Sequence, residues 1–140
     1  MTNADQLAYE ELCCYTLSRG DPSFIHQHAV DAFGAQSFTF GQKPIRLVFA
    51  LIGLHLHLDH QFTGRQVQLA HTKLGRHEGE WPVLPLPADR GAITAEAVGM
   101  AAAGPERDSI IERWCASVWA AFRDNHPVVI ALTREHHLVP

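Results

Sequence analysis

The sequence predicts an all-α protein, a single-domain helical bundle of about five to seven helices with one long proline-rich loop. Apolar residues recur at steps of three and four along most of the chain, which is the spacing of one helix face. Residues typical of helix N-caps, such as Thr63 and Thr94, stand directly before several of these segments. A chain of 140 residues is long enough to bury one core, so we expect a single domain over residues 1–140.

Four helices are expected in the first half of the chain, at residues 4–18, 22–36, 45–62 and 65–76. Gly20 is placed to end the first of them. Asp21 and Pro22 have the order of an N-cap followed by a proline in the first helical position, which predicts that the second helix begins there. Thr63 and Gly64 precede the fourth helix in the same way.

The second half is expected to begin with an irregular segment, residues 77–93, which contains three prolines and two glycines. Its apolar residues, which include Trp81 and Leu84, indicate that it lies across the core. A short helix up to Gly104, the strongly amphipathic helix 105–124 and a last helical piece over 128–135 follow. Two tryptophans of the amphipathic helix, at positions 114 and 119, are expected in the core.

Composition excludes several classes of protein. The 15 acidic residues outnumber the 11 basic ones and give a net charge of -4, which argues against nucleic-acid binding. No apolar run is long enough to cross a bilayer, so we expect no membrane partner. Three cysteines, two of them adjacent, do not form a disulfide pattern and indicate reduced thiols and a cytoplasmic location. Ten histidines are the unusual feature of the composition.

Three of those histidines fall within residues 55–60, whose order HxHxDH resembles the dinuclear metal motif of the metallo-β-lactamase hydrolases. That motif follows a β-strand, whereas here the leucines at 47, 51, 54 and 58 recur at helical spacing. Residues two positions apart on a helix point about 200° away from each other, so His55 and His57 cannot bind the same ion. We therefore set hydrolase activity of this type aside and expect His60 to face solvent.

A different metal site is expected from three successive helices, each of which has one histidine on or beside its core-facing side. These histidines are His26, His57 and His71. Helical bundles build metal sites from inward side chains of facing helices, so the three predict ligands for one divalent metal ion of unknown identity. On the second helix His26 is expected to be buried, whereas His28 is expected on the polar side.

Three further residues are expected to support this site, namely Gln27, Asp31 and Arg65. Gln27 and Asp31 would act in a second shell or in proton transfer, and Arg65 could bind a carboxylate or phosphate of a small substrate. Metal-assisted chemistry on a small molecule is then the first functional hypothesis. In the second hypothesis the histidines are hydrogen-bonded core groups of a non-catalytic module that binds a small molecule or a protein.

Six sequence segments resemble an uncharacterised bacterial family of about this length. They are FIHQHAVDAFGAQ at 24–36, KPIRLVFALIGLHLHLD at 43–59, TGRQVQLAH at 63–71, WPVLPLP at 81–87, GAIT at 91–94 and RWCASVWAAF at 113–122. The resemblance implies a single bacterial cytoplasmic domain, and it implies no activity. The candidate ligands at 26, 57 and 71 match polar positions expected in that family, whereas His28, His55 and His60 look more particular to this chain.

Overall fold

The computed structural model describes residues 2–140, which contain seven α-helices, one 3₁₀ turn and no strand. The helices are α1 (Asn3–Ser18), α2 (His26–Gln36), α3 (Pro44–His60), α4 (Gly64–Leu74), α5 (Ala95–Met100), α6 (Pro105–Ala121) and α7 (His126–Glu135), and the turn is η1 (Arg123–Asn125). The predicted all-α fold class is confirmed. All seven helices contribute to one hydrophobic core.

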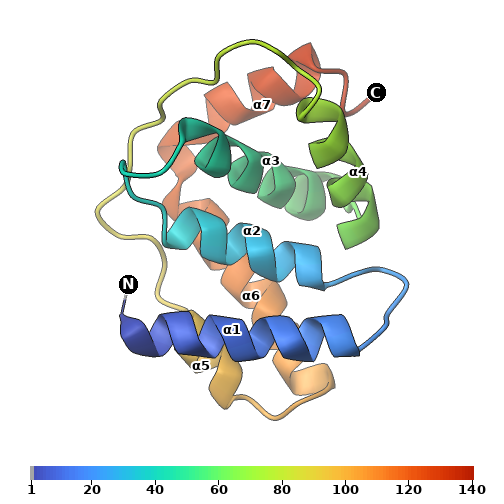
Figure 1. Ribbon diagram of the computed structural model, residues 1–140, viewed down its shortest axis with the longest axis vertical. Helices are drawn as coiled ribbons and strands as arrows, with labels where there is room; N and C mark the ends of the chain where they lie inside the picture. The colour runs from blue at the N-terminus through green and yellow to red at the C-terminus, as the bar shows by residue number, and fades with distance from the viewer. Residues whose placement is uncertain (1) are drawn as a thin grey trace.

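Helix α2 occupies the centre of the bundle. Helices α1, α2 and α3 lie one above another in Figure 1, α6 passes behind α2, and α4 stands beside the end of α3. Helix α2 contacts all four of these neighbours. A helix packed on so many sides has little solvent-facing surface, and this explains why His28 and Asp31 are buried although the sequence placed them on a polar side.

The start of α2 differs from the prediction. The helix begins at His26 and not at Pro22, because Phe24 adopts a left-handed conformation with φ of 60°. The Asp21 carboxylate caps this turn, where it accepts a hydrogen bond from the backbone N–H of Ile25 at 3.1 Å. Asp21 was predicted as the N-cap of this helix, but the N-cap position is Ile25 and has no side-chain cap, so Asp21 stabilises the turn ahead of the helix instead.

The predicted start of α4 at Thr63 and Gly64 is confirmed. This segment lies close to the turn before α2. Thr63 accepts a hydrogen bond from the backbone of Gln66, whose side chain bonds back to the backbone of Thr63. A Cβ on Gly64 would lie 1.7 Å from the carbonyl oxygen of Phe24, so only glycine allows the two segments to approach this closely.

The proline-rich segment contains no helix or strand from residue 77 to residue 94 and, as predicted, packs across the core. The Trp81 ring meets Phe49 edge-on at 5.4 Å, and Leu84 is buried. Its end is tied to α2, because the Gln36 amide donates to the carbonyl of Ile93 at 2.7 Å. Val83 is the exception to the prediction, since 69% of its surface is exposed.

Both tryptophans of α6 are buried, as the amphipathic pattern predicted. Helix α6 ends three residues before the expected position, and α7 begins two residues earlier than expected, with His126 in its first turn. All three cysteines are free. No helix within residues 2–140 has the length and apolar character that crossing a bilayer requires.

Candidate metal centre

Three potential metal ligands meet where α2, α3 and α6 converge. They are His28 in the first turn of α2, His57 in the last turn of α3 and Glu112 in the first half of α6. Their ligand atoms all lie within 4.8 Å of one another, and no other group of three such residues was found within residues 2–140. The cluster borders a cavity of about 490 Å³, so it is accessible to a small molecule.

The end of α3 orients the ring of His57. Gln61 adopts a left-handed conformation with φ of 56° and turns the chain back, which brings the carbonyl of Phe62 to 2.9 Å from His57 Nδ1. Nδ1–H therefore donates to that carbonyl. His57 Nε2 is left to face the Glu112 carboxylate, whose two oxygens both lie at 2.8 Å.

The ring of His28 stacks on the ring of His57, with a centroid distance of 3.4 Å and an interplanar angle of 17°. Only 4% of the His28 surface is exposed, and its ring nitrogens make no hydrogen bond within residues 2–140, although protein atoms do not enclose them completely. An imidazole that borders the cavity and has no protein partner on its ring nitrogens is a candidate ligand.

The surroundings shift the pKa values of the three groups in different directions. Burial, reinforced by the neighbouring His57, lowers the pKa of His28 to about 4, so this ring is neutral at pH 7. Burial alone would lower the pKa of His57, but its hydrogen bonds to Glu112 and to the Phe62 carbonyl outweigh burial and raise it. The hydrogen bond from His57 lowers the pKa of Glu112, which is therefore ionised.

Arg19 is a further charged side chain that lines this cavity, and an ion pair balances its charge. Arg19 forms an ion pair with Asp108 at 2.5 Å and donates to the hydroxyl of Tyr15 at 2.6 Å. The hydroxyl-bearing side chains of Ser23 and Thr63 also line the cavity. Asp21 lines the cavity as well, so its walls are polar and carry more carboxylates than basic side chains.

Of the three histidines expected to share a metal, only His57 belongs to this cluster. His26 is half-buried, and its Nδ1 is paired with the Thr16 hydroxyl at 2.9 Å. His71 Nε2 donates to the carbonyl of Phe49 at 2.8 Å. The structure thus gives each of the three histidines its own set of partners, and it does not bring them together.

The residues expected to support the site lie elsewhere. Gln27 and Asp31 gather around His71, and the amide of Gln27 is 3.2 Å from Asp31 and 3.4 Å from His71. Arg65 is exposed and donates to Gln68 at 2.9 Å. These side chains therefore form a separate cluster and a surface contact, neither of which touches His57.

Sequence reasoning missed His28 and Glu112. His28 was assigned to the polar side of α2, because periodicity alone does not show that a second layer of helices covers that side. Glu112 lies on the polar side of α6, where acidic residues are common on any exposed helix. Neither position carried a sequence signal that set it apart, so the cluster became evident only from the packing of α2, α3 and α6.

The chain belongs to the family of unknown function DUF5946, whose model matches residues 6–123. The matched region contains all three members of the cluster, His28, His57 and Glu112. No curated protein and no solved structure matches the chain.

Proposed function

We propose that this protein binds one divalent metal ion through His28, His57 and Glu112 and uses it for chemistry on a small molecule. The observation that carries the proposal is the convergence of two imidazoles and one carboxylate from three different helices beside a cavity of about 490 Å³. Two histidines and one carboxylate form the donor set of catalytic zinc and non-haem iron sites, in which further coordination positions stay open for water or substrate.

The environment of each group supports this role. His28 is neutral and Glu112 is ionised at pH 7, which are the states that a metal requires. The bond from His57 Nδ1–H to the Phe62 carbonyl is the contact that usually orients a metal-binding histidine, and it presents Nε2 to the ion. Only the proton on His57 Nε2 must leave when a metal binds.

A bound divalent ion would acidify a water molecule and supply a nucleophile near neutral pH. The residues of the chain would then bind and orient the substrate. Ser23, Gln61 and Thr63 offer hydrogen-bonding side chains along the cavity, and the ion pair of Arg19 with Asp108 closes one part of its wall. This arrangement suits a small polar substrate.

The competing hypothesis is a non-catalytic module in which the histidines are core polar groups. The contact of His57 with Glu112 favours it, because the two side chains already satisfy each other without a metal. Metal content distinguishes the two hypotheses.

We expect untagged protein, supplied in turn with zinc, iron(II), manganese and nickel salts and then desalted, to retain about one ion per chain for at least one of these metals. His28→Ala should abolish this retention, as measured by elemental analysis. His60→Ala is the matched control, because His60 is an exposed histidine on the same helix as His57. Substoichiometric metal in the wild-type protein, or equal retention in the His28→Ala variant, would contradict the proposal.

Metal affinity should depend on pH with a predictable sign. Below the raised pKa of His57 a metal must displace one proton, so the apparent affinity should rise about tenfold per pH unit and become constant above that pKa. His28, with its pKa of about 4, adds no pH dependence to the affinity between roughly pH 5.5 and 8. Competition titrations against a chelator at several pH values measure this slope, and an affinity that falls as the pH rises would contradict the assignment.

A further inference from the structure

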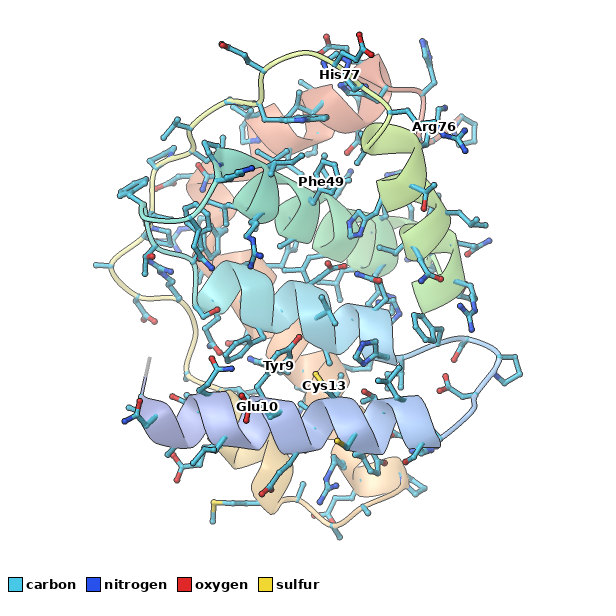
Figure 2. All side chains as sticks on the ribbon, viewed as in Figure 1. Tyr9, Glu10, Cys13, Phe49, Arg76 and His77 are labelled. Carbon is cyan, nitrogen blue, oxygen red and sulfur yellow. The ribbon has the colours of Figure 1, made fainter. Side chains whose placement is uncertain are left out.

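A second cavity, of about 510 Å³, lies along α2 and shares no lining residue with the cavity at the metal centre. Side chains of α1, α3 and α4 complete its walls. Figure 2 shows two of them, Tyr9 on α1 and Phe49 on α3, on opposite sides of α2. We call this space the α2 cavity.

One end of the α2 cavity is formed by the cluster of Gln27, Asp31 and His71. His71 Nε2–H donates to the Phe49 carbonyl, so its Nδ1 is an acceptor that faces the amide of Gln27. That amide donates to both neighbours, but at 3.2 Å and 3.4 Å, which is the long end of the range for hydrogen bonds. An oxygen atom of a ligand would therefore displace these contacts at little cost.

Asp31 is a buried carboxyl group whose hydrogen bonding is incomplete. Only 3% of its surface is exposed, and its Oδ2 is the one buried side-chain oxygen or nitrogen of the described chain with no hydrogen-bond partner. Burial raises the pKa of Asp31 well above its usual range, which favours the neutral, protonated acid. Oδ2 packs against Gly53, which does not line the cavity, so the Gln27 amide is the hydrogen-bond donor that this end offers to an acceptor on a ligand. A neutral Asp31 beside it adds no negative charge that would repel an anionic ligand.

The opposite end of the α2 cavity is lined by Ser37, Gln42 and Arg46. Arg46 is exposed and takes part in none of the ion pairs found within residues 2–140. From Asp31 to Ser37 the rise of α2 is roughly 9 Å, at 1.5 Å per residue. The two polar ends are thus separated by an apolar middle, to which Val30 and Phe49 contribute.

We propose that the α2 cavity binds a small organic acid, with its carboxylate at Arg46 and a hydrogen-bond acceptor at the Gln27 and Asp31 end. Arg46 is the one arginine or lysine that lines the cavity, and burial lowers the pKa of His71, which favours a neutral ring there. An unpaired guanidinium group and a neutral acid select an anionic, acceptor-rich ligand over an amine. The apolar middle selects a hydrocarbon chain between the two ends.

The test compares two probes of matched length, adipate and 1,6-diaminohexane, with chelator-treated protein. Adipate is expected to bind with a Kd of ~10 mM or tighter and to shift the backbone amide resonance of Gly34, which lies midway along the cavity. The diamine is expected not to bind. Arg46→Gln should weaken adipate binding about tenfold or more. Arg65→Gln, which removes another exposed arginine outside the cavity, should leave it unchanged.

A further variant separates this proposal from the metal centre, to which a carboxylate could also bind. Adipate should bind His28→Ala protein as tightly as wild type, because His28 does not line the α2 cavity. Diamine binding at least as tight as that of adipate, an Arg46→Gln variant with unchanged affinity, or loss of adipate binding in His28→Ala would each overturn the assignment. The absence of any adipate-dependent shift in the wild-type protein would do so as well.

Discussion

Replacing Glu112 with glutamine is expected to weaken metal binding at least about a hundredfold, because an amide supplies no charge and is a poor ligand for a divalent ion. The substitution preserves the size of the side chain and allows its oxygen to face His57 as before. Glu112 is half-exposed on α6, so the variant should fold. The measurement is the Kd for the metal that the wild-type protein retains, obtained by competition with a chelator.

The same variant provides a second readout that a purely structural ion pair would also produce. Without the carboxylate, the pKa of His57 should fall, since the hydrogen bond to Glu112 is the larger of the two bonds' contributions that oppose burial. The His57 titration, followed by NMR, should therefore move to lower pH. A lower His57 pKa together with unchanged metal affinity would show that Glu112 is only a partner of His57 and not a ligand. Glu106→Gln, at an exposed position in the first turn of α6, is the matched control.

The pH dependence of the metal-free protein has the opposite sign from that of metal binding. A raised pKa means that the folded state binds the His57 proton more tightly than the unfolded chain does. The contribution of this ion pair to stability is therefore complete below the pKa of an unfolded histidine, and it is lost as the pH rises through the folded-state pKa. Metal binding reverses the trend, because the ion replaces that proton.

The helices could be predicted from local patterns, because caps and apolar spacing act within a few residues. Thr63 and Gly64 indicated the start of α4, and the helical spacing of the leucines in α3 predicted its structure better than the alternation in HxHxDH did. The faces of α2 could not be predicted in this way. Its apolar side indicated one buried surface, but the contacts of α2 with four other helices bury nearly all of it. His28 and Asp31 are buried by elements distant in the sequence.

The candidate site shows the same difference between local and distant information. His57 was identified because it lies beside the core-facing stripe of its own helix. Its pairing with Glu112 joins residues 55 positions apart, so the periodicity of either helix could not predict it. Gln27, Asp31 and His71 were expected together, and they do meet, but around the α2 cavity and not around His57.

The same three helices that hold the candidate ligands continue into the core one turn further on. From His28, His57 and Glu112 the next inward turn carries Asp31, Gly53 and Cys115, at steps of three or four residues. Asp31 fits there only because the facing residue on α3 lacks a side chain. A Cβ on Gly53 would lie 2.0 Å from Asp31 Oδ2, far inside contact distance.

Gly53→Ala is therefore expected to destabilise the metal-free protein by about 2–4 kcal/mol, because the added methyl group must displace a fully buried carboxyl group. This loss exceeds the gain of roughly 1 kcal/mol that alanine normally brings to a helix interior. Gly34→Ala is the matched control, since its Cβ would meet only Ala50 at 3.5 Å, an ordinary contact. That variant should be as stable as the wild type or slightly more stable in urea unfolding.

The double variant Asp31→Ala, Gly53→Ala identifies the cause of the loss. If the overlap with Asp31 is responsible, removing that carboxyl group should recover most of the stability, with a coupling of about 2 kcal/mol between the two positions. Additive effects of the two substitutions would show that Gly53 is needed for another reason. A recovery would also establish that the close packing of α2 on α3, on which the positions of His28 and His57 depend, is set by the Asp31 and Gly53 contact.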